Sequence, residues 1–169
     1  MKKLMNGAQM KMIDTYSIQE VGIPSLVLME RAALCVTEAV LEKIKKTDKV
    51  LCVCGSGNNG ADDMAVARQL TERGISAEVY TTAEEGKGTE ELNRQRAILQ
   101  KLGIVFVNDI PAGEYNCIID AVFGIGLSRT ITGRYEQIIE KINAAKDTGS
   151  LIVAVDTPCL LYTSDAADE

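Results

Sequence analysis

The sequence contains no histidine at all. Histidine is the side chain most often used as a general base near neutral pH, and it is also the commonest protein ligand for metals. Its absence excludes histidine-based triads and histidine metal centres. Any proton transfer in this protein must therefore use carboxylates, lysine, tyrosine or water.

Clustered positive charge is also missing. The chain has 169 residues, a formal net charge of −6 and no run of basic residues. Nucleic acids and anionic membrane surfaces are bound by clustered lysine and arginine, so neither is an expected partner. A nucleotide remains compatible with this charge, because backbone N–H groups at a helix N-terminus can hold phosphate.

Long apolar runs and paired cysteines are absent as well. The first residues lack the apolar stretch of a signal peptide, and no apolar run is long enough to span a bilayer. The cysteines show no C-x-x-C spacing, and Cys52, Cys54 and Cys117 fall in strand-like apolar runs. These features predict buried, reduced cysteines in a cytoplasmic protein.

Helical and strand-like patterns alternate along the chain. Helical periodicity is expected at residues 8–20, 25–45, 62–73, 89–102 and 135–145, with Ser25 as a cap, and strands at 50–54, 75–80, 104–107, 117–120 and 151–155. Such alternation predicts an α/β fold, a Rossmann-like three-layer α/β/α sandwich with a mostly parallel, doubly wound sheet.

A glycine-rich loop follows the first predicted strand. Residues 55–60 read GSGNNG, which fits G-x-G-x-x-G between a strand and a helix, where the glycines allow a tight turn and close backbone approach to a phosphate. The motif alone does not specify a phosphate site, and the crowded Asn58, Asn59, Asp62 and Asp63 make this loop too polar for a simple phosphate cradle. A dehydrogenase would also need an acid near the end of the next strand, where this chain has Thr81 and Thr82. The neighbouring Asp62 and Asp63 are either functional or merely favourable charges at a helix N-terminus.

Two further predicted strands end in an acid, Asp120 and Asp156. In open α/β sheets, ligands bind at the carboxyl ends of strands near a switch point, so these acids should meet the glycine-rich loop there. Oxygen-rich side chains suit a hard cation. Gly124 and Gly126 would admit a phosphate, with Arg129 as its charge partner. Asp120 as a turn former and Arg129 as a surface charge remain the alternatives.

Taken together, four stretches resemble the YjeF N-terminal domain, the NAD(P)HX epimerase family. They are GIPSLVLMERAA at 22–33, CGSGNNG at 54–60, IIDAVFGIGLSR at 118–129 and VAVDTP at 153–158. The resemblance implies an isomerase that interconverts the R and S epimers of hydrated NADH and NADPH (NADHX and NADPHX). It also implies a homodimer, a bound potassium ion and a partner dehydratase that uses ATP or ADP to restore the S epimer.

The resemblance also implies roles for individual residues. Asp62 would be the catalytic acid/base, and Asn59 and Asp120 would hold the potassium ion. The substrate-binding residues implied by the resemblance are Asn58, Asn59, Gly60, Ala61, Asp62, Gly124, Ile125, Gly126, Leu127, Ser128, Arg129, Thr130 and Asp156.

The chain departs from the family pattern in three respects. Ala61 and Asp63 replace two glycines, and Asp63 is expected to add a negative charge beside the phosphates. Cys159 and Leu160 stand where the family has Ser-Gly, whose serine would bind potassium. The last strands are absent, and residues 159–169, CLLYTSDAADE, resemble the translation of a sequencing-library adapter. The expected organisation is a truncated domain at 1–158 followed by a foreign tail.

Two other functions remain open. A non-catalytic dimerisation or scaffold module of the same family would be free to lose Asn59, Asp62 and Asp120, and all three are retained. An NAD-dependent oxidoreductase would need a ribose-binding acid and a proton relay, and neither is evident. The sequence therefore favours the epimerase.

Overall fold

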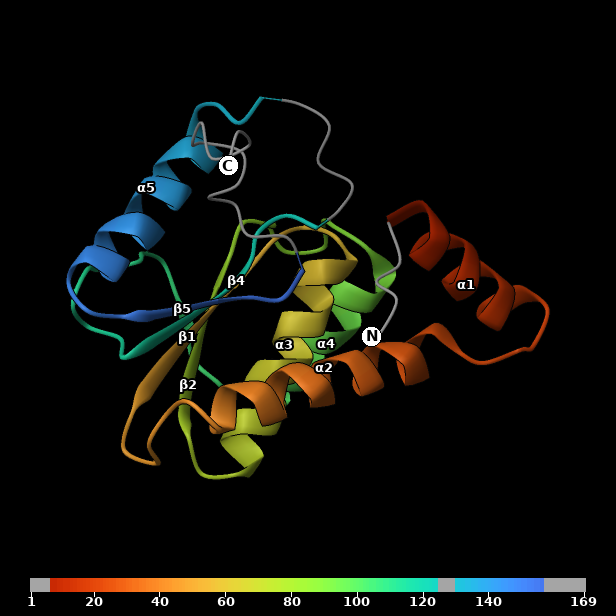
Figure 1. Ribbon diagram of the computed structural model, residues 1–169, viewed down its shortest axis with the longest axis horizontal. Coiled ribbons are helices and arrows are strands. Elements are labelled where there is room, and N and C mark those ends of the chain that lie inside the picture. Colours follow the sequence, from red (N-terminus) through yellow and green to blue (C-terminus); the bar gives the residue numbers. More distant parts are fainter. Residues whose placement is uncertain (1–6, 125–129, 157–169) are drawn as a thin grey trace, which may run out of the picture.

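A computed structural model describes residues 7–124 and 130–156 of the chain (Figure 1). From β1 onward helices and strands alternate as the sequence predicts, except that β4 follows β3 with no helix between them. The helices are α1 (Gly7–Gln19), α2 (Ser25–Leu41), α3 (Asn58–Glu72), α4 (Glu90–Lys101) and α5 (Arg134–Asp147). The strands are β1 (Lys49–Cys54), β2 (Ser76–Thr81), β3 (Phe106–Val107), β4 (Cys117–Ala121) and β5 (Leu151–Ala154).

The strands form one sheet in the order β3-β2-β1-β4-β5. Every strand pair is parallel, with Val50 opposite both Ala77 of β2 and Cys117 of β4. The chain winds outward from β1 in one direction and then returns to β4 on the other side. This doubly wound order confirms the predicted fold and puts the switch point between β1 and β4, where ligands bind in such sheets.

Helices cover both faces of the sheet (Figure 1). One core layer joins the sheet to α2, α3 and α4 through residues such as Val40, Met64 and Leu99, all fully buried. The other layer joins it to α5 through Ile138 and Ile142. The central strand β1 is apolar on both of its faces because both are covered, which explains its continuous run of apolar residues.

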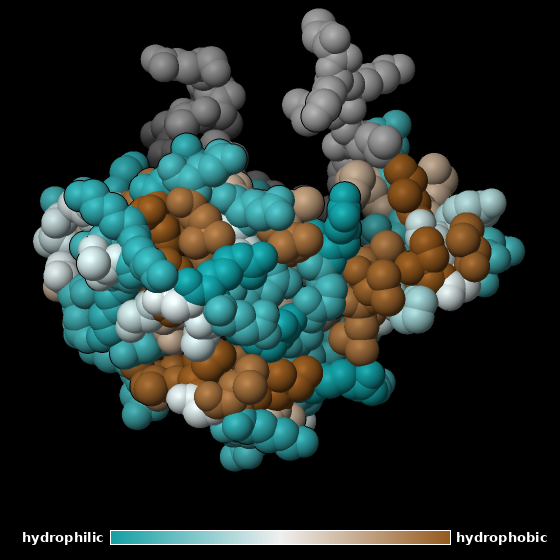
Figure 2. All heavy atoms as spheres, turned by 90° about the horizontal axis from the view of Figure 1, so that it is seen from below, coloured by the Kyte–Doolittle hydropathy of each residue, from teal (hydrophilic) through white to brown (hydrophobic). Residues whose placement is uncertain are grey.

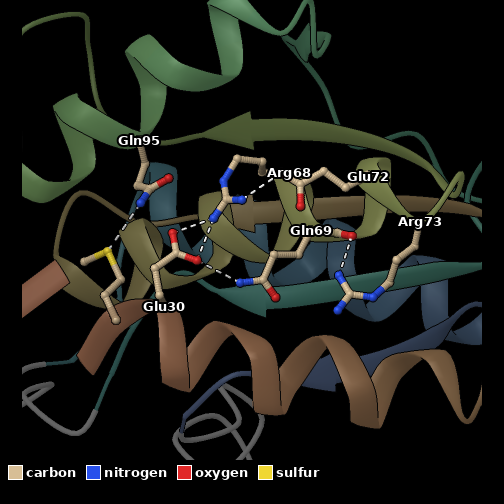
Figure 3. Close-up of polar contacts among 7 residues, drawn as sticks. Glu30, Arg68, Gln69, Glu72, Arg73 and Gln95 are labelled. Atoms are coloured by element: carbon tan, nitrogen blue, oxygen red, sulfur yellow. Dashed lines mark hydrogen bonds and ion pairs between the residues drawn. The ribbon is translucent and has the colours of Figure 1, made fainter. Parts of the chain in front are cut away.

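A polar network fastens α2 to α3 (Figure 3). Arg68 of α3 pairs with both carboxylate oxygens of Glu30 on α2, and its other terminal nitrogen lies 2.8 Å from Glu72. Gln69 donates a hydrogen bond of 3.0 Å to Glu30. A planar guanidinium that meets a carboxylate in this way sets the relative position of the two helices. The α2–α3 packing in turn supports the glycine-rich loop that leads into α3.

One predicted helix start and one predicted helix cap are wrong. The helix after the glycine-rich loop begins at Asn58, four residues before the predicted start, so Asp62 and Asp63 lie inside it and do not cap it. Ser25 does not cap α2 either, because Pro24 takes the capping position. The Ser25 hydroxyl instead donates to Glu91 at 3.0 Å. In both cases a tertiary contact, of Gly60 with Gly55 or of Ser25 with Glu91, overrides the local preference.

The first helix stands apart from the body. Figure 1 shows α1 projecting beyond the N-terminal end of α2, and Figure 2 shows apolar side chains gathered on it. Its exposed apolar residues are Met10, Met12, Ile13, Tyr16 and Ile18. Over residues 7–124 and 130–156, no helix is long and apolar enough to cross a membrane.

Candidate functional site

A cavity of about 860 Å³ opens at the carboxyl edge of the sheet. The segments that follow β1, β4 and β5 form its floor, and α1, α2 and α5 contribute its walls. Its lining residues are Met10, Asp14, Ala32, Val36, Ser56, Gly57, Asn58, Asn59, Gly60, Asp62, Val122, Phe123, Gly124, Tyr135, Val155 and Asp156. A cavity of this size at a topological switch point can hold a small organic ligand.

Two glycines make the loop after β1 possible. A Cβ on Gly55 would lie 2.2 Å from the carbonyl oxygen of Val122, and a Cβ on Gly60 would lie 2.1 Å from the carbonyl oxygen of Gly55. No side chain fits in such space, so the loop turns tightly against the segment after β4. Gly57, by contrast, has nothing within 4 Å of its Cβ position and faces the cavity.

The loop after β1 meets the segments after β4 and β5 at one point. The amide nitrogen of Asn59 donates to the carbonyl oxygen of Phe123 at 2.8 Å. A Cβ on Gly124 would lie 2.8 Å from a carboxylate oxygen of Asp156 and 3.5 Å from the Cβ of Asn59. Three strand ends thus converge, as the sequence predicts, and the absence of a side chain at Gly124 allows them to do so.

Asp62 projects into this cavity from the second turn of α3. Burial, reinforced by the nearby carboxylates of Asp14 and Asp156, raises the pKa of Asp62 from its ordinary value of 3.8 to about 7. A carboxyl group with this pKa exchanges a proton easily near neutral pH, as a general acid or base must.

Asp63, its neighbour, lies in the core. The side chain is fully buried, and its Oδ2 accepts a hydrogen bond from the Cys54 thiol at 3.5 Å. Burial raises the pKa of Asp63 well above its usual range, opposed by contacts with Cys52 and Cys54. The expectation that Asp63 places a negative charge beside the phosphates is therefore wrong. Its side chain points into the sheet, where the protonated form is favoured.

Asp120 is nearly buried at the end of β4. Its Oδ1 accepts from the backbone N–H of Val122 at 3.1 Å, which is the turn-forming contact foreseen as one alternative. Asn59 lies across the same junction. Within the described part of the chain, no group of three or more histidine, cysteine, aspartate or glutamate residues could hold a metal. Asn59 and Asp120 provide amide and carboxylate oxygens of the type that hard cations bind.

The remaining predicted residues have different positions. Asn58, Gly60 and Asp156 line the cavity. Ala61 is fully buried, and its N–H bonds back to the Gly57 carbonyl at 3.2 Å. Thr130 is exposed. The predictions for Ile125, Gly126, Leu127, Ser128 and Arg129 concern residues outside the described ranges.

Several lining residues were not predicted from the sequence. Asp14 and Met10 reach the cavity from α1, and Tyr135 reaches it from the start of α5. Tyr135 stands beside Phe123 with ring centroids 5.1 Å apart and a tilt of 44°. These rings form an apolar part of the cavity lining and can pack against a planar ring of a ligand. The sequence signal that could have predicted the contribution of α1 is the spacing of Met10 and Asp14, which places both on one face of a helix.

The model of one protein family, the YjeF-related protein N-terminus, matches residues 25–167. That range contains every strand of the sheet and all of the described lining residues except those on α1. The chain belongs to this family. The identification confirms the resemblance found in the sequence.

This chain is similar to relatives within the family over most of their length. The chain is 38% identical over 168 residues to the NAD(P)H-hydrate epimerase of Limosilactobacillus fermentum, covering 98% of this chain and 79% of the relative. It is 41% identical over 147 residues to the enzyme of that name in Oenococcus oeni, covering 86% and 69%. The crystal structure of yeast ynu0 superposes with a TM-score of 0.81 at 23% identity, over 94% of this chain and 71% of that one, which supports the fold.

Proposed function

We propose that this YjeF N-terminal domain is an NAD(P)H-hydrate epimerase, which interconverts the R and S forms of hydrated NADH and NADPH. Relatives of that name align with nearly the whole chain. The observation that carries the proposal is Asp62, a carboxyl group with a pKa of about 7 in a polar cavity of about 860 Å³. The cavity has room for a dinucleotide portion, and its rim carries the glycine-rich turn typical of phosphate sites.

Asp62 is the proposed catalytic residue. Epimerisation requires a bond at the hydrated carbon to break and then form again on the opposite face of the ring. A single group that both donates and accepts a proton serves the two halves of this reaction. Asp62 populates both protonation states near neutral pH because burial and the acids Asp14 and Asp156 favour its protonated form.

The remaining described residues would bind and orient the substrate. Backbone groups of the tight turn at Gly55 to Gly60 support phosphate, and the contact of Asn59 with Phe123 fixes the turn to the opposite wall. The neighbouring Tyr135 and Phe123 would exclude water from one side of the cavity. We also propose that Asn58, Gly60, Ala61, Gly124 to Thr130 and Asp156 bind substrate.

A potassium ion is part of the proposal. Asn59 and Asp120 would hold it, since both carry oxygen ligands and both lie at the junction of the segments after β1 and β4. When bound, the ion supplies a fixed positive charge beside an otherwise acidic cavity, which would favour anionic substrate groups.

Three further properties belong to the proposal. The exposed apolar side chains of α1 are suited to a homodimer contact. The S epimer produced needs an ATP- or ADP-dependent dehydratase to return it to NADH or NADPH, so such a domain or protein is the functional partner. Cys52, Cys54 and Cys117 are free and buried, as in proteins of a reducing compartment, and we propose a cytoplasmic location.

The proposed function is tested with the full chain and a mixture of R- and S-NADHX. A separate S-specific dehydratase and ATP remove the S form, and chromatography follows the loss of the R form. We expect the protein to accelerate this loss, and Asp62→Asn to reduce the acceleration about 100-fold or more. Asp120→Asn tests the potassium ligand in the same assay. Loss of R-NADHX no faster than its spontaneous epimerisation would reject the proposed reaction and favour the scaffold reading.

A further inference from the structure

The face that α1 turns toward the cavity carries one ionisable group. Met10 and Asp14 lie one turn apart on the same face, and both line the cavity. Lys11 and Thr15 face a separate shallow hollow along the same helix. The helix thus brings a carboxylate, and no cation, to the cavity in which Asp62 lies.

Acids dominate the ionisable groups of this cavity. Among the described residues that line it, the titratable side chains are Asp14 on α1, Asp62 on α3, Tyr135 on α5 and Asp156 after β5. The neighbouring Asp63 does not line the cavity: it is fully buried, and burial raises its pKa well above the usual range. Asp14 and Asp156 are both exposed, and Asp14 is the member of this set that lies on the projecting helix α1. Its negative charge is the largest single charge contribution that raises the pKa of Asp62, after the effect of burial.

We infer that Asp14 is a positioning residue of this site, which acts through Asp62 by placing a negative charge in the same cavity from a different helix. The inference rests on the proposed epimerase function. Asp14 does not need to touch the reacting carbon. Its effect is electrostatic and depends on α1 lying beside the cavity, so that a helix outside the α/β sandwich adjusts the acidity of the group that transfers the proton.

The test is the dependence of kcat/KM for R-NADHX on pH, measured for the full-length protein and for Asp14→Asn. We expect the apparent pKa of the profile to fall by a few tenths of a pH unit in the variant, because an exposed charge has a modest effect. Asp14→Glu should restore the original midpoint. Raising the salt concentration from about 0.01 M to about 1 M should shrink the difference, since the screening length falls from about 30 to about 3 Å.

The control is Glu20→Gln, which removes one negative charge just beyond the same helix but outside the residues that line the cavity. Its profile should match that of the unaltered protein. A lower rate at every pH with no change of midpoint in Asp14→Asn would assign Asp14 a merely structural role and overturn the inference. A shift of equal size in Glu20→Gln would also overturn it, because the effect would then follow the net charge.

Direct titration separates this inference from the proposed function. The carboxyl carbon of Asp62 can be followed by NMR in ¹³C-aspartate-labelled protein, with Asp62→Asn to assign the signal, and no substrate is needed. A lower midpoint in Asp14→Asn upholds the link between the two residues even if no epimerase activity is found, in which case only the reaction is rejected. Equal midpoints in the two proteins overturn the inference whatever the activity.

Discussion

The amino edge of the sheet, where its strands begin, and the carboxyl edge, where they end, differ in how their charged residues are arranged. At the amino edge, Lys49 lies 2.7 Å from Glu114 and 3.2 Å from Glu78, and it stands 4.7 Å from the ring centroid of Tyr115. The Tyr115 hydroxyl donates to Glu78 at 2.7 Å. At the carboxyl edge, Asp62 faces other acids across an open cavity. The same sheet thus carries paired opposite charges at one end and like charges at the other.

This difference separates residues that stabilise the fold from residues that prepare a site. Opposite charges at the amino edge satisfy one another in the absence of any ligand. Like charges at the carboxyl edge oppose folding slightly, and a bound cation or a proton relieves the repulsion. Such local instability is common at functional sites, where it is compensated by the rest of the structure.

The largest expected effect is on activity, and it distinguishes the two edges. Asp62→Asn should lower epimerase kcat/KM about 100-fold or more while leaving the melting temperature unchanged or slightly raised, since a repulsive charge is removed. Lys49→Met should leave kcat/KM nearly unchanged, because Lys49 lies at the opposite edge from the cavity. Steady-state kinetics and calorimetry of both variants check this. Equal losses of activity would remove the functional contrast between the edges.

A glycine pair tests the backbone of the carboxyl edge. Gly55→Ala should lower the free energy of unfolding by about 2–3 kcal/mol, because the new Cβ would meet the Val122 carbonyl oxygen at 2.2 Å. Gly57→Ala is the matched control in the same loop, where nothing lies within 4 Å and φ is −103°. Urea unfolding of the two variants makes the measurement. Similar losses of unfolding free energy in the two variants would show that the close contact between the loop and Val122 does not cause the destabilisation.

The dependence of stability on pH tests whether the pKa of Asp62 at the carboxyl edge is raised. The folded pKa of Asp62 is raised from 3.8 to about 7, so the folded chain retains a proton that the unfolded chain has lost. The contribution of Asp62 to the free energy of unfolding is fully present below about pH 4, and it is lost as the pH rises toward about 7. We expect the free energy of unfolding to decline over this window by on the order of 1–2 kcal/mol, and less in Asp62→Asn. Asp63 changes in the same direction, so some decline should persist. A slope unchanged in Asp62→Asn would contradict the assignment.

The smallest effect is expected at the amino edge. Lys49→Met should lower the free energy of unfolding by about 0.5–1 kcal/mol at low salt, since its two glutamates lose their partner. High salt should reduce the difference. The exposed Lys43, changed to Met, controls for the loss of one positive charge. Equal effects of Lys43→Met and Lys49→Met would show that the paired arrangement adds nothing.

Most of the fold could be predicted from the sequence because it depends on local patterns. The apolar run of β1 and the glycines that follow α3 and α4 mark the alternating elements well. The start of α3 was misjudged because Asn58, Asn59 and Gly60 have the composition of a loop. Their helical conformation depends on the close approach of Gly60 to Gly55, which is a tertiary contact.

The site could be predicted only in part. Asn59, Asp62 and Asp156 follow strands at recognisable positions, so their convergence follows from the topology of a parallel sheet. Asp63 was misplaced because an acid beside another acid in a loop-like segment is normally solvated, and only the packing of α3 on β1 shows that it is buried. Asp14 was missed because the position of α1 beside the cavity depends on contacts distant in sequence.

The cysteines of the sheet can report how often the helices that cover them move away from the sheet. Cys52, Cys54 and Cys117 are fully buried on adjacent strands, and burial raises the pKa of all three thiols. All three lie in the core layer between the sheet and α2, α3 and α4. Alkylating reagents attack the thiolate, so these positions react only when this helix layer moves off the sheet. Cys35, on α2, is exposed and can be modified without such a motion. The delay between the modification of Cys35 and that of the three buried cysteines would therefore report how often the helix layer lifts off the central strands beneath the cavity.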